Sequence, residues 1–283
     1  MSRSGWRVLA AASVLAANAA QAADAPVPAA ATGCAAPPEL LVIEPALGHA
    51  ATRIERGDKL TIVAVGSSST EGVGASGPSF TYPSRLQAML AKRFPDAPIR
   101  VINRGKGGED APEELARLDR DVIAERPDLV IWQLGTNAVL RRDDPVADGE
   151  QIERGVAKLR RGPSDVVLMD MQYAPRVIAR PAYATMRRLL ADTAKRARIG
   201  LFRRFDIMRH WHEAARPGAP PMIGPDGLHM TDRGYDCLAL GLAEALARNW
   251  RRHQRAMPFW ETATVADIAG GRPSPASDGS TAQ

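Results

Sequence analysis

The segment Lys59–Gly72, KLTIVAVGSSSTEG, joins an apolar run to a glycine and four consecutive hydroxyl side chains. The run Lys59–Val65 is short, apolar nearly throughout and rich in β-branched residues, which is typical of a strand buried on both faces. Gly66 permits a tight exit from such a strand. The segment therefore predicts a buried strand that ends in a sharp polar turn.

The chain repeats this pattern of a short apolar run followed by an amphipathic stretch. Further strands are predicted at 99–103, 129–134, 166–171 and 199–205. Five helices are predicted from apolar residues at helical spacing: Leu86, Met89, Leu90 and Phe94; Leu115, Leu118 and Val122; Ile152, Val156 and Leu159; Tyr183, Met186 and Leu190; Tyr235, Leu238, Leu242 and Leu246. Apolar strands that alternate with helices imply a parallel sheet covered on both faces, with right-handed crossovers. We therefore expect one doubly wound α/β domain of about five strands.

The composition is that of an ordinary globular protein. Of 283 residues, 45% are hydrophobic and 24% are charged, which is enough for a sizeable core. The net charge of +5 falls to about +3 without residues 1–22, which contain two arginines and no acid. Arginines interspersed with acids, as in EELARLDRDVIAER (113–126), indicate solvated helix faces. We therefore expect no nucleic-acid partner.

The two ends of the chain differ in composition from its middle. Residues 1–22 combine Arg3 and Arg7, a short apolar run and a final AQA, which is the pattern of a secretory signal peptide. We expect residues 23–38 to be a flexible Ala/Pro arm, 39–256 the folded domain and 257–283 a disordered tail. No other run approaches the roughly 18 apolar residues of a membrane helix. The prediction is a periplasmic or secreted protein without stable membrane insertion after signal cleavage.

The chain contains two cysteines, Cys34 and Cys237. In an oxidising compartment an even number favours one disulfide, which here would join the amino-terminal arm to a late helix. Two independent buried thiols are an alternative. A lipid-modified Cys34 is a third, although the residue lies far beyond the apolar run and lacks the expected leucine before it.

Glycines and small polar residues follow the first three predicted strands, in GSSSTEG (66–72), NRGKGGED (103–110) and GTNA (135–138). The ligand crevice of a parallel sheet lies at the carboxyl ends of its strands. A fourth segment, IGPDGLHMTDRGY (223–235), places Asp226 three residues before His229 and just ahead of the last helix. Hydrolysis by a serine needs a hydroxyl, an imidazole, a carboxylate and N–H donors for the oxyanion. These segments can supply all four at one edge of the sheet.

In this order, GSSSTEG, NRGKGGED, GTN and DGLH resemble the four blocks of the SGNH hydrolases, also called the GDSL esterase/lipase family, over about Lys59–Arg248. The resemblance implies a flavodoxin-like three-layer α/β/α sandwich with a parallel five-stranded sheet. It also implies a serine esterase in which Ser68 is the nucleophile, His229 the base and Asp226 the carboxylate that orients it. Such an enzyme requires no metal and no organic cofactor.

The same resemblance assigns the oxyanion hole to the backbone amides of Ser68 and Gly108 and to the side chain of Asn137. Gly107 is the alternative to Gly108, one residue earlier in the register. The chain departs from the family at Ser67, where the family usually has aspartate. Because that aspartate supports the loop, the departure puts local hydrogen bonding in doubt more than the triad.

We expect the substrate to be a short-chain ester, in particular an acetyl ester, possible carriers being a carbohydrate or a cell-envelope glycan. Aromatic residues make up only 5% of the chain and no long apolar lid segment is evident, which disfavours a deep lipid tunnel. The segment DMQYAPR (170–176) brings Gln172, Tyr173 and Arg176 to the same edge, either to line a substrate cleft or only to shape the loop. Three alternative functions stay open: an exported O-acetyltransferase, a glycan-binding protein, and a lysophospholipase or thioesterase. The sequence does not indicate the oligomeric state.

Two other interpretations of GSSSTEG, a phosphate-binding loop and the nucleophile elbow of α/β-hydrolases, are each disfavoured by one residue. GSSSTEG has the G-x-x-x-x-G skeleton of a phosphate-binding loop, but Val73 stands where lysine is required. The G-x-S-x-G elbow of α/β-hydrolases ends in glycine, and Thr70 stands there. The remaining histidines lie in no comparable context and receive no role: His49, His210, His212 and His253.

Overall fold

The computed structural model describes residues 33–141 and 145–256. Its sheet has five parallel strands in the order β2-β1-β3-β4-β5, as expected for a flavodoxin-like fold: β1 (Leu60–Gly66), β2 (Ile99–Gly105), β3 (Leu129–Gln133), β4 (Asp165–Met169) and β5 (Gly200–Phe202). The expected signal peptide, the first ten residues of the expected arm and the expected tail lie outside the described residues.

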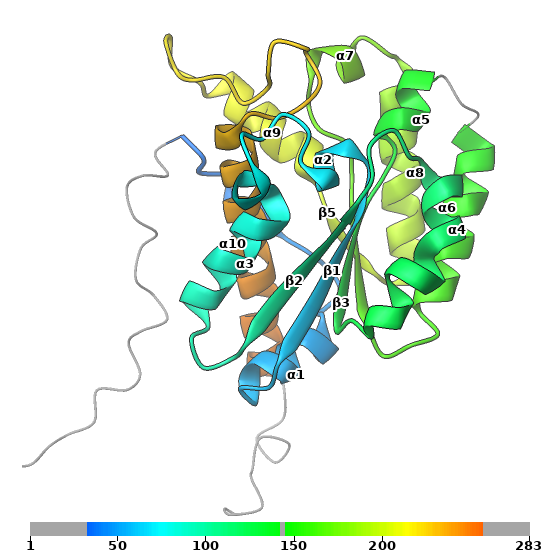
Figure 1. Ribbon diagram of the computed structural model, residues 1–283, viewed down its shortest axis with the longest axis vertical. Coiled ribbons are helices and arrows are strands. Elements are labelled where there is room, and N and C mark those ends of the chain that lie inside the picture. Colours follow the sequence, from blue (N-terminus) through cyan, green and yellow to red (C-terminus); the bar gives the residue numbers. More distant parts are fainter. Residues whose placement is uncertain (1–32, 142–144, 257–283) are drawn as a thin grey trace, which may run out of the picture. The chain divides into compact units, whose positions relative to one another are not determined.

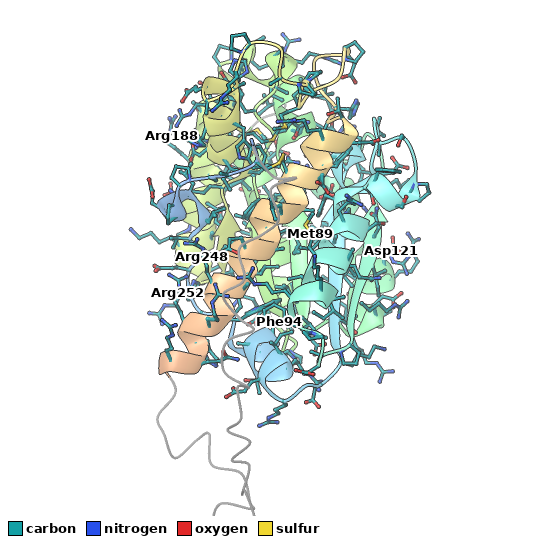
Figure 2. All side chains as sticks on the ribbon, turned by 90° about the vertical axis from the view of Figure 1, so that its left-hand side faces the viewer. Met89, Phe94, Asp121, Arg188, Arg248 and Arg252 are labelled. Atoms are coloured by element: carbon teal, nitrogen blue, oxygen red, sulfur yellow. A yellow bond between two sulfur atoms is a disulfide. The ribbon has the colours of Figure 1, made fainter. Side chains whose placement is uncertain are left out.

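Helices cover both faces of this sheet (Figure 1). On one face lie α3 (Tyr82–Arg93) and α10 (Asp232–Ala256), and on the other α4 (Ala111–Asp121), α6 (Pro145–Leu159) and α8 (Ala182–Ala197). Figure 2 shows α10 running beside α3, with Arg248 and Arg252 on α10 and Met89 on α3. The remaining helices are α1 (Gly48–Glu55), α2 (Ser68–Glu71), α5 (Thr136–Arg141), α7 (Pro175–Ile178), α9 (Arg204–Glu213), η2 (Pro38–Leu41), η3 (Pro78–Phe80) and η4 (Ile123–Glu125).

Burial explains why the central strands read as continuous apolar runs. All seven residues of β1 and all five of β3 are buried, because these strands lie inside the sheet and have helices on both faces. β2, at the sheet edge, is mostly half-buried. The core therefore lies on both sides of β1 and β3, and the carboxyl ends of these two strands are rigidly placed.

The fifth strand is shorter than the sequence predicts. The expected run 199–205 leaves the sheet after Phe202, and Phe205 belongs to α9. The side chain of Asp170 accepts the backbone N–H of Phe205 at 2.9 Å, which holds the first turn of the helix. The sequence analysis did not predict α9, although Phe205, Met208 and Trp211 are buried at helical spacing, because the expected strand 199–205 took in the start of the helix.

Side-chain caps fix the starts of two helices next to the predicted site. Asp110 and Glu113 form a capping box at the start of α4. The hydroxyl of Thr231 accepts the backbone N–H of Gly234 at 3.2 Å at the start of α10. These caps fix the chain directions just after NRGKGGED and DGLH, the two segments that approach the predicted site from either side.

The expected disulfide joins Cys34 to Cys237 across 203 positions of sequence. Beside it, the indole N–H of Trp211 is within hydrogen-bonding distance of the carbonyl oxygens of Cys34 (3.0 Å) and Ala35 (3.1 Å). These contacts attach residues 34 and 35 to α9 and α10. This part of the segment that we expected to be a flexible arm is therefore anchored to the folded domain.

In the part of the chain that the structure describes, no helix combines the length and the apolar character that crossing a membrane requires.

Candidate active site

Ser68, His229 and Asp226 form a continuous hydrogen-bonded chain at the carboxyl edge of the sheet. Ser68 is the first residue of α2 and follows the end of β1 by two positions, and its Oγ lies 2.9 Å from His229 Nε2. The other ring nitrogen, Nδ1, lies 2.5 Å from Asp226 Oδ2. The histidine side chain is 18% exposed and the aspartate 44%. This is the order of groups that nucleophilic attack by a serine requires, and solvent reaches it.

The three-residue spacing of Asp226 and His229 produces a self-supporting turn. Asp226 Oδ1 accepts the backbone N–H groups of Leu228 and His229, both at 3.0 Å, while Gly227 adopts a left-handed φ of 68°. Burial by itself raises the pKa of Asp226, but these two bonds and the bond to the imidazole outweigh it, so the pKa lies below its ordinary value. The carboxylate is therefore ionised when it orients the ring.

The segment after Ser68 is joined directly to the start of α10. The Tyr235 hydroxyl donates to the carbonyl oxygen of Val73 at 2.6 Å. Ser76 donates to the Asp232 carboxylate through its amide at 2.8 Å and its hydroxyl at 2.6 Å. A Cβ atom at Gly74 would lie 2.5 Å from the Met230 carbonyl oxygen, so only glycine permits this approach. These contacts hold the segment after Ser68 against the start of α10 and against residues 223–230, the loop that contains His229 and is called the histidine loop below.

The two glycines of NRGKGGED differ in what their amides bind. The N–H of Gly107 donates to Glu71 Oε2 at 2.8 Å. The N–H groups of Gly108 and Ser68 make no hydrogen bond with any described residue. Gly108 has a left-handed φ of 79° and open space around its Cα. An oxyanion donor must be free to bind substrate, so this pattern favours Gly108 over the alternative Gly107.

Asn137 lies at the start of α5, and its side chain bonds to the residue after Gly108. Its side-chain N–H₂ donates one bond, to the carbonyl oxygen of Glu109, at 2.7 Å. That bond fixes the amide plane and leaves the second N–H for another acceptor. The preceding Gly135 has a φ of 88°, and a Cβ atom there would lie 2.7 Å from the Met186 side chain.

Ser67, where the resembling family has aspartate, bonds to Gln133 at the end of β3. Gln133 Oε1 accepts the Ser67 amide (3.1 Å), the Ser67 hydroxyl (3.2 Å) and the Thr70 hydroxyl (3.2 Å). A Cβ atom at Gly66 would lie 2.8 Å from the same oxygen, so glycine is needed there. Sequence reasoning missed Gln133. The available signal was a single polar residue at the end of an otherwise apolar buried strand.

Gln172 does not line a substrate cleft, which corrects that expectation. Its side chain is fully buried. Its oxygen accepts from the Thr136 hydroxyl at 2.9 Å and from the Arg204 guanidinium at 3.0 Å, and its nitrogen donates to the Leu228 carbonyl at 3.2 Å. The residue joins the segment before Asn137 to the loop between Asp226 and His229. A buried amide has to find such partners, and here they come from the start of α5, the start of α9 and the loop before α10.

Tyr173 and Arg176 are solvent-accessible near the histidine loop. Tyr173 is half-buried, with its ring edge-on to Phe205 and 5.3 Å from the His212 ring centroid. Arg176 is exposed, and its backbone N–H donates to the Gly227 carbonyl at 3.0 Å. Within residues 33–141 and 145–256, no group of three or more His, Cys, Asp or Glu side chains is arranged to hold a metal ion.

The sequence is similar to a known protein family and to a known esterase. A family model described as the non-GDSL lipase-like family matches residues 33–252. An acetylxylan esterase from Geobacillus stearothermophilus is 35% identical over 98 residues, which cover 32% of this chain and only 45% of that protein.

Two solved structures share the fold. A two-domain esterase (CEX) active on acetylated mannans gives a TM-score of 0.61 at 22% identity, over 74% of this chain and 56% of that one. Axe2, an acetylxylan esterase from Geobacillus stearothermophilus, gives 0.57 at 21% identity, over 68% of this chain and 95% of that one. The family match takes in all five strands and every segment of the site. The chain therefore belongs to the non-GDSL lipase-like family, in agreement with its resemblance to the SGNH hydrolases.

Proposed function

We propose that this protein is a serine esterase that removes short acyl groups, in particular acetyl groups, from a carbohydrate. The observation that carries the proposal is the hydrogen-bonded chain from Ser68 Oγ through His229 to Asp226, with unpaired backbone N–H groups beside the serine. Membership of a lipase-like family and similarity to an acetylxylan esterase support the same reaction class.

In the proposed mechanism, His229 takes the Ser68 proton as Oγ attacks the ester carbonyl, while Asp226 holds the ring in the competent tautomer. The amides of Ser68 and Gly108 and the free N–H of Asn137 stabilise the tetrahedral oxyanion. His229 then donates its proton to the leaving alcohol. Water, activated by the same imidazole, releases the acyl group as a carboxylic acid and restores the serine.

The exposure of the triad supports a bulky alcohol as the carrier of the acyl group. The Asp226 side chain is 44% exposed, so a large carrier can approach from solvent. The relatives named above act on acetylated xylan and mannan, which supports an acetylated glycan as carrier. The Cys34–Cys237 disulfide supports action in an oxidising compartment, such as the periplasm or the exterior.

The proposal is tested by acetate release from acetylated xylan and by hydrolysis of p-nitrophenyl acetate. Ser68→Ala should abolish both, and Ser79→Ala, at an exposed serine in η3, should retain both. Equal activity of Ser68→Ala and the wild type would overturn the assignment. Transfer of acetyl to an added xylo-oligosaccharide, without free acetate, would indicate a transferase. Binding without turnover would indicate a glycan-binding protein.

A further inference from the structure

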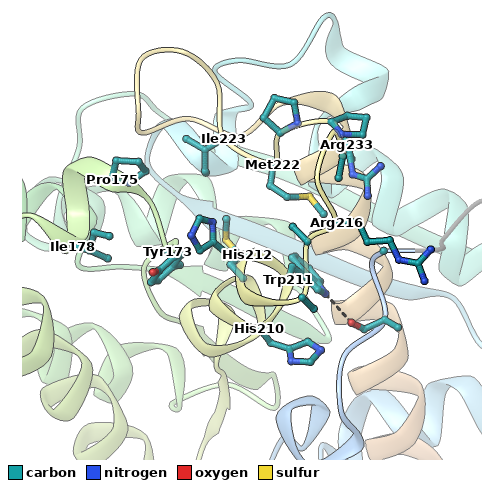
Figure 3. A pocket seen from close by; sticks show the side chains of 18 residues that line it. Tyr173, Pro175, Ile178, His210, Trp211, His212, Arg216, Met222, Ile223 and Arg233 are labelled. Atoms are coloured by element: carbon teal, nitrogen blue, oxygen red, sulfur yellow. Dashed lines mark hydrogen bonds between the residues drawn. The ribbon is translucent and has the colours of Figure 1, made fainter.

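A cavity of about 910 Å³ lies between α9, residues 214–223 and the loop after β4 (Figure 3). The triad residues Ser68, Asp226 and His229 are not among the residues that line it. It nevertheless borders the histidine loop, because Ile223 lines the cavity and pairs in an antiparallel bridge with Met230, the residue after His229. One loop therefore separates the cavity from the triad.

The charged residues that line this cavity are both arginines. The lining includes Arg216, Arg233, His210 and His212, and it contains no aspartate or glutamate. Neither guanidinium group has an ion-pair or hydrogen-bond partner within the described ranges, and Arg233 Nε is buried without one. Unpaired guanidinium groups in a concave site favour an anionic ligand, above all a carboxylate or another planar oxyanion.

The opposite end of the cavity offers flat, apolar surfaces. Figure 3 places Tyr173, Pro175 and Ile178 at one end and Arg216 and Arg233 at the other, with His212 between them. The rings of Tyr173 and His212 lie 5.3 Å apart, and His212 is exposed. A ligand that fits both ends has a ring face to pack on the aromatic side chains and a negative group on the guanidinium side.

We propose that this cavity binds an acidic saccharide, a uronate residue or a short oligosaccharide that carries one. Its carboxylate bonds to Arg216 and Arg233, and its sugar ring packs against Tyr173 and His212. The inference rests on the proposed function in one respect: the uronate belongs to the glycan whose ester the triad attacks. The enzyme would then select acetylated glycans that carry acidic branches.

Binding is measured by titration calorimetry with the wild-type protein and unacetylated ligands, so that turnover plays no part. The ligands are a glucuronic-acid-bearing xylo-oligosaccharide, a neutral xylo-oligosaccharide of equal length, and sodium sulfate. We expect the acidic oligosaccharide to bind at least about tenfold more tightly than the neutral one, as one charge-assisted contact provides. Arg216→Ala and Arg233→Gln should each remove most of that preference. Arg160→Ala, at an exposed arginine after α6, is the matched control and should leave it unchanged.

A second variant separates a saccharide site from a general anion site. His212→Ala should weaken binding of the acidic oligosaccharide but not of sulfate, because only the sugar packs on the ring. Equal affinity for acidic and neutral oligosaccharides would overturn the inference, as would affinity for sulfate equal to that for the acidic oligosaccharide. Acetate release with equal affinity for the acidic and neutral oligosaccharides would support the proposed esterase activity and overturn only the saccharide site. Preferential binding of the acidic oligosaccharide without acetate release from acetylated xylan would support the saccharide site and overturn the proposed esterase activity.

Discussion

The backbone amide of Gly107 donates to the carboxylate of Glu71 at 2.8 Å, across 36 positions of sequence. Glu71 is the last residue of α2, and Ser68 is the first. One four-residue helix therefore carries the proposed nucleophile and also anchors the loop that presents the Gly108 amide. The spacing between the two proposed backbone donors, the amides of Ser68 and Gly108, therefore depends on the Glu71 side chain.

Replacing Glu71 with alanine should lower kcat while changing KM little. Without the carboxylate, the Gly107–Gly108 segment loses its bond to α2 and keeps the one from Arg141 to the Gly108 carbonyl, so the Gly108 amide is held less firmly. Complete loss of one oxyanion donor costs about 10²–10³ in kcat, and that cost is the upper limit of the expected effect. Steady-state kinetics with p-nitrophenyl acetate measures the effect. Glu71→Gln keeps an acceptor oxygen and should recover most of the loss. Glu55→Ala, at an exposed glutamate in α1, is the control. A Glu71→Ala enzyme with wild-type kcat would show that the anchor is not needed.

Asn137→Ala should reduce kcat by about 10²–10³ while the protein stays folded. One amide hydrogen of Asn137 is bound to the Glu109 carbonyl, so the substitution also frees that carbonyl, but the side chain is only partly buried and water can replace the bond. The kcat is measured on p-nitrophenyl acetate, and the thermal midpoint is measured by circular dichroism. A loss of activity that tracked a loss of folding would argue against a catalytic role.

Much of the fold follows from sequence because its local signals agree with the tertiary arrangement. β1 is apolar along its length because helices cover both its faces, and the capping pair Asp110 and Glu113 marks the start of α4 within a single turn. The triad candidates were found for a similar reason. Each lies just after a strand or just before the last helix, where a parallel sheet collects its functional groups.

What sequence could not supply is the identity of buried polar partners. Gln133 and Gln172 are fully buried, and each bonds to groups at least 30 positions away in sequence. Their role depends on which loops meet at the sheet edge, and no local pattern encodes that. The strand predicted at 199–205 is present as β5, but its predicted end was wrong, because Phe205 belongs to α9 and its amide is bound by Asp170.

Glu114→Gln should flatten the pH dependence of stability. Burial raises the pKa of Glu114 from 4.5 to about 8, opposed in part by the 2.6 Å bond from the Trp132 indole. The native state thus keeps a proton that the unfolded chain releases. Its stabilising contribution is complete below pH 4.5 and is lost as pH rises through about 8, by up to about 1.4 kcal/mol per pH unit. Glutamine keeps an acceptor for the indole and does not titrate.

The measurement is urea unfolding of both proteins at pH 5, 6.5 and 8. We expect the stability of the wild type relative to Glu114→Gln to fall steadily across this range. Burial also raises the pKa values of Asp165 and Asp170 to about 6, but both groups are present in both proteins and cancel in the difference. Parallel pH curves would show that Glu114 is already ionised in the native protein.

Removing the disulfide should lower stability and leave the chemistry intact. Cys34 and Cys237 close a loop of 203 positions, and a native crosslink of this kind contributes about 2–5 kcal/mol, largely by restricting the unfolded chain. The double variant Cys34→Ser, Cys237→Ser should lose that amount in urea unfolding, and reduction of the wild type should reproduce the loss. Its kcat should stay at the wild-type value, because the Asp226–His229 turn is held by its own hydrogen bonds. A fall in kcat under fully folded conditions would instead mean that the crosslink positions α10 for catalysis.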